Sequence, residues 1–374
     1  MITTEAVALP NYRRIAEELR TQICANVLRP GHRLPSHQSL SRRFAVSRVT
    51  IRQALMLLQQ RGYVQMIPKT GTFVSEMITS LRRTRHRLVA LLVENCQDPF
   101  FNEMTQHIER ELLRANLHMV LCDTAGAGPE VSYVDVLKDR VDGFIIAPSL
   151  QESSWTQYRA LASTRLPYVL FDRDIRTIPG NRVLVDNYFG GRIAADHLAD
   201  LGHSSFVTVT YRWPDRAHET PSEALRLRIC GFKDRLIERG IPESDVMSLV
   251  GGGGRTKDAG AEAAMQWVNL RPRPTGLFAT NDILCLGVIE VAEKSGLRMP
   301  RDFSIVGFDD INLVRWLNIP LTTVAQPKEE IARHVVGLLL TQNAEARGDH
   351  TQHELLKPRL VIRSSTGCAP KTAE

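Results

Sequence analysis

Short apolar runs recur along most of this chain, and the spacing between them leaves room for a helix after each run. Runs of this kind are typical of parallel sheets with crossover helices, because strands buried on both faces carry apolar residues on both. They are Leu88–Val93, Met119–Cys122, Gly143–Ala147, Tyr168–Phe171, Phe206–Val209, Val246–Val250, Gly276–Ala279, Ser304–Gly307 and Leu321–Val324. Their number predicts an α/β fold with two doubly wound parallel-sheet lobes.

The first 75 residues follow another pattern. Apolar residues at every fourth position predict a helix over Tyr12–Val27. Ser36 and Ser47 each precede a further amphipathic segment and are expected to cap a second and a third helix. Two short runs, Tyr63–Ile67 and Thr72–Val74, then predict a hairpin. Three helices followed by a hairpin make a small winged helix-turn-helix domain.

Charge is divided unevenly between these two parts. The first 87 residues hold 15 Lys and Arg against 4 Asp and Glu, a net charge of +11, whereas the other 287 hold 32 basic and 37 acidic residues, a net charge of −5. This asymmetry is expected when one part of a protein meets a polyanion and the other does not. A merely solvated basic face is the alternative that charge alone leaves open.

Composition argues against several other classes. The six cysteines are scattered without Cys-x-x-Cys spacing, so we expect no metal site and no disulfide framework. We also expect no cofactor. The amino terminus lacks the basic and apolar regions of a signal peptide, and no apolar run is long enough to span a membrane. We therefore expect a cytoplasmic protein without a membrane partner, located at the nucleoid if it binds DNA.

Four motifs stand in order within the amino-terminal part. They are Gly31–Ser36, Phe44–Arg48, Thr50–Leu55 and Gly71–Val74. In this order and spacing they closely resemble the GntR family of regulators, which implies binding to a double-stranded DNA operator. In such a domain the third helix places side chains in the major groove, and the wing follows the minor groove or a phosphate.

The resemblance and the predicted helix starts give ten candidate DNA contacts. They are Ser36, Gln38, Ser47, Arg48, Val49, Thr50, Arg52, Lys69, Thr70 and Gly71. We favour Arg48 and Arg52 as readers of bases or phosphates because they lie at the start of the third helix. For the wing residues an ordinary hairpin turn is the alternative. The chain departs from the family pattern at His37, where a glutamate is expected, and at Gln38, so an operator preference does not carry over.

Nine motifs stand in order in the remaining three quarters of the chain. They are Asp98–Phe101, Val141–Gly143, Phe171–Arg173, Val185–Asn187, Leu201–His203, Arg228 with Gly231–Phe232, Thr280–Asp282, Gly307–Asp310 and Pro320–Thr323. Together they resemble the LacI-type regulators and the related periplasmic sugar-binding proteins. This resemblance implies a ligand between two lobes, at the carboxyl ends of the parallel strands. A GntR-type domain joined to a LacI-type domain is similar to the architecture of the arabinose repressor.

Ten residues are candidates for contact with that ligand. They are Phe100, Phe101, Asp172, Arg173, Arg228, Arg255, Asn281, Asp282, Asp309 and Trp316. Charged and amide groups that directly follow strands can form hydrogen bonds with the hydroxyl groups of a ligand. The aromatic rings would stack on a sugar or base, and core packing is the alternative for each ring. Asp186, Asn187 and Asp310 are weighted lower because an Asp between a strand and a helix is often a cap.

One departure bears on the nature of the ligand. Where relatives often carry an aromatic residue, this chain has Gly251–Gly254 followed by Arg255. With Arg173 and Arg228, this arginine would offer up to three cations to one cleft. An anionic ligand such as a sugar acid or sugar phosphate therefore stays open beside a neutral sugar.

The two resemblances imply a division of the chain into four segments. We expect a winged helix over residues 1–75, a basic linker over 76–87, an effector domain over 88–366 and a disordered tail over 367–374. The linker, which contains Arg82, Arg83, Arg85 and Arg87, either lies close to the DNA or is a plain flexible tether.

Three function classes were weighed. The leading hypothesis is a repressor, homodimeric on a palindromic operator, in which a sugar or sugar-derived effector changes the spacing of two DNA-binding domains. The second is an enzyme that uses a nucleotide or pyridoxal phosphate, but Gly251–Gly254 fits neither phosphate-binding glycine pattern, and no lysine motif or Ser-His-Asp order stands out. The third, a periplasmic sugar-binding protein, conflicts with the basic winged helix and the missing signal peptide.

Overall fold

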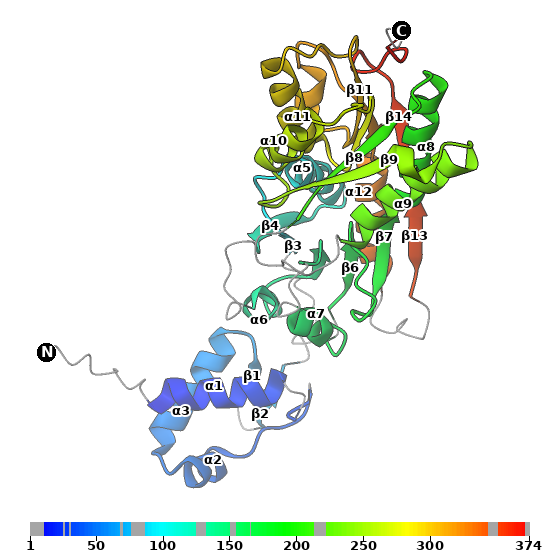
Figure 1. The fold of residues 1–374 in the computed structure, drawn as a ribbon. Helices are drawn as coiled ribbons and strands as arrows, with labels where there is room; N and C mark the ends of the chain where they lie inside the picture. Colours follow the sequence, from blue (N-terminus) through cyan, green and yellow to red (C-terminus); the bar gives the residue numbers. More distant parts are fainter. Residues whose placement is uncertain are drawn as a thin grey trace, which may run out of the picture. The chain divides into compact units, whose positions relative to one another are not determined.

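The computed structural model describes residues 11–24, 27–29, 31–67, 70–75, 87–124, 132–149, 155–164, 166–212, 222–342 and 351–370. The chain divides into two compact units, Met1–His86 and Arg87–Glu374, drawn in blue and in cyan to red in Figure 1. Within the described ranges, no helix combines the length and apolar character needed to cross a membrane. Lys69, the predicted linker before Arg87 and the last four residues of the predicted tail lie outside the described residues.

The first unit contains three helices and a two-stranded antiparallel hairpin. They are α1 (Asn11–Cys24), α2 (His37–Phe44), α3 (Arg48–Gln60), β1 (Val64–Ile67) and β2 (Gly71–Val74). Leu19, Leu40 and Leu55 lie in the small core that joins the three helices. Val27, predicted to continue the apolar stripe of the first helix, is 70% exposed instead. The reason is that α1 ends at Cys24, after which the chain turns and the Val27 amide bonds back to the Gln22 carbonyl.

The first lobe of the second unit is built on a six-stranded sheet of order β13-β7-β6-β5-β3-β4, in which all neighbours are parallel. Its strands are β3 (Leu88–Val93), β4 (His118–Asp123), β5 (Gly143–Ile146), β6 (Tyr168–Phe171), β7 (Asn181–Val185) and β13 (His353–Leu356). Its helices are α5 (Pro99–Arg114), α6 (Tyr133–Leu137), α7 (Trp155–Leu161) and α12 (Lys328–Thr341).

The second lobe repeats this plan with the strand order β14-β12-β11-β10-β8-β9. Its strands are β8 (Phe206–Tyr211), β9 (Val246–Gly251), β10 (Gly276–Ala279), β11 (Ser304–Asp309), β12 (Thr322–Ala325) and β14 (Arg359–Val361), the last of them antiparallel to β12. Its helices are α8 (Asn187–Asp200), α9 (Glu223–Glu238), α10 (Lys257–Trp267), α11 (Asp282–Lys294) and two 3-10 turns, η2 (Glu243–Asp245) and η3 (Asn312–Arg315).

Apolar layers cover the two faces of each sheet. One cluster packs α6 and α7 against the first sheet, and another packs α8 and α9 against the second. A third cluster includes α5 and α12 in the first lobe and α10 and α11 in the second. Helices on both faces of mainly parallel sheets confirm the predicted doubly wound architecture.

Three strands had no counterpart among the predicted apolar runs. In β7 the buried Arg182 interrupts the run, and its charge is met by Asp174. The other two, β13 and β14, lie at sheet edges, where one side of the strand has no neighbour and polar residues are tolerated. The chain passes from the first lobe to the second after β7, returns after β12 through α12, and crosses again between β13 and β14.

Candidate ligand cleft and nucleic-acid interface

The exposed face of α3 carries three of the predicted DNA contacts. Arg48, Val49 and Arg52 are exposed, whereas Ile51 and Leu55 on the opposite face are fully buried. Neither arginine pairs with a carboxylate among the described residues. A cation without an internal partner is available to phosphates and base edges, and the start of a recognition helix is where such contacts form.

Three other candidates build the starts of the helices. Ser36 caps α2, because its Oγ accepts from the Ser39 amide at 3.1 Å. Ser47 caps α3 by accepting from the Thr50 amide at 3.1 Å, and the Ser47 and Thr50 hydroxyl oxygens lie 2.9 Å apart. These bonds fix where the helices begin, so any DNA contact by the serines comes in addition to capping. Gln38 is exposed on α2.

A further arginine, Arg33, lies beside the wing turn and close to three of the predicted DNA contacts. Gly71 has a φ of +138°, a conformation that L side chains rarely adopt. Arg33 lies directly against this glycine, and with Ser36 and Thr70 it lines a cavity of about 410 Å³ between the hairpin and the start of α2. Arg33 was not among the predicted contacts, although it lies inside the first GntR-like motif.

Asp309, at the end of β11, is the centre of a buried polar cluster in the second unit and is 1% exposed. Its Oδ1 accepts from Gln326 Nε2 at 2.7 Å and from Arg228 Nη1 at 3.4 Å. Its Oδ2 accepts from Arg255 Nη2 at 2.5 Å and from Asn281 Nδ2 at 2.9 Å. Burial alone would raise the pKa of this carboxyl, but the arginines outweigh burial and lower it. Asp309 is therefore ionised.

The Arg228 side chain makes three further contacts within the second lobe. Its Nε donates to Asn187 Oδ1 at 2.8 Å, and its Nη1 donates to the Thr280 carbonyl at 2.6 Å. The guanidinium carbon lies 3.6 Å from the centre of the Phe308 ring. With 3% of the residue exposed, Arg228 is a fixed part of the second lobe.

Arg255 connects the two lobes. Besides its bond to Asp309 in the second lobe, its Nε lies 3.1 Å from Oδ2 of Asp98 in the first lobe. Asp98 caps α5 with its other oxygen, which accepts from the Phe100 amide at 2.9 Å. One guanidinium thus pairs with two carboxylates that come from different lobes.

The first lobe contributes the third arginine of the cluster, Arg173, whose side chain is 10% exposed. Arg173 donates to the Glu94 carboxylate and to the Pro148 carbonyl, and its Nε lies 3.5 Å from Asp172 Oδ2. Burial raises the pKa of Asp172 even though Arg173 opposes the rise. Asp172 and Asp309 have φ values of +69° and +112°, which non-glycine residues seldom adopt. Such strain is concentrated at functional sites.

The predicted aromatic contacts differ in their surroundings. Phe100 and Phe101 are 1% exposed, and the guanidinium groups of Arg255 and Arg173 lie 5.4 Å and 5.8 Å from their ring centres. Both rings also belong to the large core cluster of the second unit. Trp316, the third predicted aromatic contact, follows η3, is 84% exposed and lies outside the buried cluster.

Asp282 is another of the predicted ligand contacts. It is fully buried, its Oδ1 accepts from the Thr323 hydroxyl at 2.6 Å, and its Oδ2 accepts from the Ile311 amide at 2.9 Å. Burial, with the neighbouring Asp309 charge as a second cause, raises its pKa to about 8. Both oxygens thus bond within the second lobe, to Thr323 and to the segment after β11.

The three residues that were ranked lower as ligand contacts have different roles in the structure. Asp186 caps α8 through the Phe189 amide at 2.9 Å, and Asp310 pairs with Arg315 and Arg363, so neither enters the cluster. Asn187 does enter it through Arg228. Sequence reasoning missed three members that each follow a strand or precede a helix, and this position was the available signal: Glu94, Asp98 and Gln326. In the described part of the chain no group of His, Cys, Asp and Glu could hold a metal ion.

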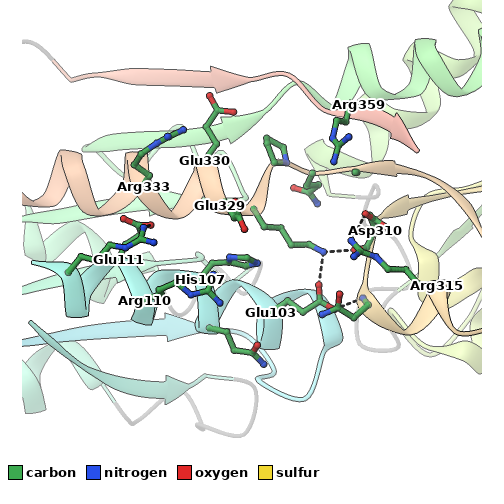
Figure 2. Close-up of a pocket in the computed structure, with 17 residues that line it drawn as sticks. Glu103, His107, Arg110, Glu111, Asp310, Arg315, Glu329, Glu330, Arg333 and Arg359 are labelled. Atoms are coloured by element: carbon green, nitrogen blue, oxygen red, sulfur yellow. Dashed lines mark hydrogen bonds and ion pairs between the residues drawn. The ribbon is translucent and has the colours of Figure 1, made fainter. Parts of the chain in front are cut away.

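A separate polar cavity of about 780 Å³ lies between α5 and α12 (Figure 2). Lys328, one of its lining residues, donates to Glu103 Oε2 and to the Asp310 carbonyl, each at 2.7 Å. Glu103 also accepts from the Asn312 amide at 2.6 Å, so this cavity marks a second junction between the lobes. Acidic and basic side chains are mixed around it, and they favour no single class of ligand.

Comparison with known proteins separates the same two parts of the chain. Residues 11–74 match the profile of bacterial regulatory proteins of the gntR family, and residues 195–366 match that of the periplasmic binding protein-like domain. The HTH-type transcriptional regulator DegA of Bacillus subtilis is 31% identical over 294 residues, which cover 77% of this chain and 83% of that protein. The chain belongs to the HTH-type transcriptional regulators.

Two further relatives have the word repressor in their names. The arabinose metabolism transcriptional repressor of Geobacillus stearothermophilus is 25% identical over 370 residues, 96% of this regulator and 98% of that protein. The repressor PurR of Photobacterium profundum is 28% identical over 293 residues, 78% of this regulator and 84% of that protein. The GntR and LacI resemblances are confirmed, and the enzyme alternative finds no support among these relatives.

Solved structures match the second unit. A LacI family transcriptional regulator from Enterococcus faecium with bound ribose has a TM-score of 0.64 and 29% identity, covering 75% of this regulator and 99% of that chain. A periplasmic binding protein/LacI transcriptional regulator from Alkaliphilus metalliredigens, in complex with D-xylulofuranose, has a TM-score of 0.62 and 27% identity, with the same coverage of 75% and 99%.

Proposed function

We propose that this regulator is a repressor whose binding to DNA is controlled by a neutral sugar held between the two lobes of its second unit. The observation that carries the proposal is the buried cluster around Asp309, because it gathers ionised and amide groups of both lobes close to strand ends. Such groups bind sugar hydroxyls through charge-assisted hydrogen bonds.

The charge balance of the cluster favours a neutral ligand over a sugar acid. Its three arginines, Arg173, Arg228 and Arg255, are all paired with carboxylates. The carboxylates are four: Glu94, Asp98, Asp172 and Asp309. The buried Oδ1 of Asn281 accepts no hydrogen bond from a described residue. An added anion would meet no arginine of this cluster without a carboxylate partner, whereas a hydroxyl supplies the missing donor.

The relatives support the same ligand class. Ribose and D-xylulofuranose are bound in the two structural neighbours, and one relative is named for arabinose metabolism. All three names refer to pentoses or pentuloses. We therefore place neutral five-carbon sugars first among candidate effectors.

At the DNA end, we propose that α3 enters the major groove with Arg48 and Arg52 toward bases or phosphates, while Arg33 and the wing contact the backbone. Two copies would read the halves of a palindrome as a homodimer at the nucleoid. Leu313 and Trp316, which are 48% and 84% exposed near η3, are candidates for the surface between the copies.

Control of DNA binding by the sugar requires a change in the second unit that reaches the first. The connection enters the first lobe at Arg87, whose amide donates to Asp142 Oδ2 at 2.6 Å just before β3. A rotation of the first lobe against the second would therefore move the anchor point of the DNA-binding unit.

The test combines ligand and DNA binding by the full chain. D-ribose, L-arabinose and D-xylose should raise the melting temperature, because a ligand that binds only the folded state stabilises it by mass action, whereas D-ribonate should not. The active sugar should then alter the mobility shift of a duplex selected from a random library. Replacement Asp309→Asn should abolish the response to sugar without abolishing DNA binding. Stabilisation by D-ribonate alone would contradict the proposal.

A further inference from the structure

The carboxylate of Asp309 has no free acceptor position for a ligand. A carboxylate offers about four lone-pair sites. Four donors fill them: Gln326 Nε2 and Arg228 Nη1 on Oδ1, and Arg255 Nη2 and Asn281 Nδ2 on Oδ2. A sugar hydroxyl can therefore bond to Asp309 only if one of these donors leaves.

Three of the four donors are buried residues of the second lobe. Arg228 is held by Asn187, the Thr280 carbonyl and the Phe308 ring. Asn281 directly precedes α11, and Gln326 directly follows β12, so the backbone of each belongs to the rigid second lobe. Both residues are buried. Among the described residues, the bonds of these three side chains stay within the second lobe, whereas Arg255 also pairs with Asp98 of the first lobe.

Arg255 is the donor that can leave. It follows Gly251–Gly254, of which Gly253 and Gly254 have φ values of +83° and +82°, and these four glycines contribute no side chains to pack against it. The contacts of its guanidinium are with two carboxylates and, at 5.4 Å, the Phe100 ring. Its buried Nε lies near Asp98 without a properly directed hydrogen bond.

We propose that Arg255 is an internal ligand of the cleft, which competes with the sugar for Asp309 and sets the affinity of the effector. The inference rests on the proposed function, because it concerns the same cluster. When Arg255 withdraws, Asp309 Oδ2 and the Phe100 ring become available to the sugar, and Asp98 loses its link to the second lobe. Sugar binding and the break of this bridge between the lobes are then one event, which couples ligand occupancy to lobe movement.

The main test is replacement Arg255→Met, which keeps a long side chain but removes the competing donors. Titration calorimetry with D-ribose, L-arabinose and D-xylose should show at least tenfold tighter binding by the variant than by the unmodified chain. Arg301→Met, the same change at an exposed arginine of the second lobe, should leave the affinity unchanged. Weaker or equal binding by Arg255→Met would show that Arg255 contacts the ligand or plays no part, and would overturn the inference.

The variant leaves Asp98 without its partner, so a second version guards against misfolding. In Asp98→Asn with Arg255→Met both charges are removed, and the asparagine retains the ability to cap α5. This double variant should also bind the sugar at least tenfold more tightly. Failure of both folded proteins to gain affinity would count against the inference.

A second probe does not depend on the sugar. In Arg255→Ala the vacated position between Asp98 and Asp309 should accept methylguanidinium, which should raise the melting temperature of this variant at millimolar concentration. The unmodified chain and Arg301→Ala should show no such rise. If no sugar binds any of the proteins, the proposed function fails, and methylguanidinium still tests whether Arg255 is a displaceable ligand of the cleft. If methylguanidinium stabilises Arg255→Ala no more than the controls, the inference about Arg255 fails even where sugars bind.

Discussion

The recognition helix and the buried cluster use arginine in opposite ways. Arg48 and Arg52 are exposed on α3 and have no carboxylate partner among the described residues. Arg173, Arg228 and Arg255 are nearly buried, and each lies within 4 Å of a carboxylate. An exposed, unpaired cation releases counterions when it meets a phosphate, so its contribution to binding depends on salt. A buried, paired cation is screened little by salt and instead fixes the positions of its neighbours.

Replacing an arginine has different consequences in the two environments. Removing an exposed arginine leaves nothing behind that requires a partner. Removing a buried one leaves carboxylates in a region of low dielectric, and the desolvation cost of the remaining charges falls on the folded state. The first kind of change should therefore affect binding, and the second should affect stability.

The largest effect is expected from Arg228→Ala. Breaking a buried pair from one side costs about 3–5 kcal/mol of the free energy of unfolding, and the contact with the Phe308 ring is lost as well. Urea denaturation followed by tryptophan fluorescence measures this loss. Arg228→Lys, which restores a charge without the planar fork, should recover only part of it. A loss below about 1 kcal/mol would mean that Arg255 alone can neutralise Asp309.

The next effect is on DNA binding. Arg48→Ala should weaken binding to a selected duplex by about 1–3 kcal/mol, or roughly tenfold to over a hundredfold, and should lower the dependence of affinity on salt. The melting temperature should not change, because no internal partner is lost. Arg14→Ala removes the same charge from an exposed position on α1 and is the matched control. Equal losses in the two variants would indicate attraction by net charge rather than contact by α3.

The sequence predicts more of the structure of the DNA-binding unit than of the buried cluster. Its motifs are contiguous, and the caps at Ser36 and Ser47 were predicted where the structure has them. In the cluster, the donors to Asp309 come from positions as far apart as Arg228 and Gln326. Which residues follow strands could be predicted, but which of them face one another depends on the order of strands in the sheet.

Two predicted ligand contacts, Asp282 and Trp316, are not among the side chains that bond to Asp309, and the reason is similar. Asn281 and Asp282 are adjacent in the sequence, yet Asn281 donates to Asp309 while Asp282 points to Thr323 and Ile311. No periodicity distinguishes the two side chains, since both belong to a strand-to-helix junction. Trp316 resembled a ligand contact by residue type alone. Its exposure depends on the path of the chain after β11, which local pattern does not specify.

A third prediction uses Asp282, a buried carboxyl without a cation. Burial raises its pKa to about 8 in the folded state, whereas an unfolded chain has the ordinary value of 3.8. The folded state therefore keeps a proton that the unfolded state releases, and the stability associated with this group falls as the pH rises from about 4 to about 8. In Asp282→Asn this titration is absent. The difference in unfolding free energy between the two proteins should change by at most about 1.4 kcal/mol per pH unit.

The measurement is urea denaturation of both proteins at intervals from pH 5 to pH 8.5. The advantage of the unmodified chain over Asp282→Asn should shrink steadily and level off above pH 8. His197 and His203, whose pKa values are lowered by burial, titrate in both proteins and cancel in the difference. Parallel curves would mean that Asp282 is ionised throughout and that Thr323 and Ile311 stabilise its charge.

The smallest effect is expected from Arg192→Ala, which separates pairing from burial. Arg192 is paired, like the arginines of the cluster, since two of its nitrogens donate to the Glu238 oxygens at 2.7 Å each. Its setting is nevertheless closer to that of Arg48, because the pair lies at the surface between α8 and α9, with 26% and 46% of the two side chains exposed. Exposed pairs gain little, because water competes for both partners and salt screens them. The midpoint of urea denaturation should therefore not shift measurably. A loss comparable to that in Arg228→Ala would show that pairing, rather than burial, makes an arginine of this protein structural.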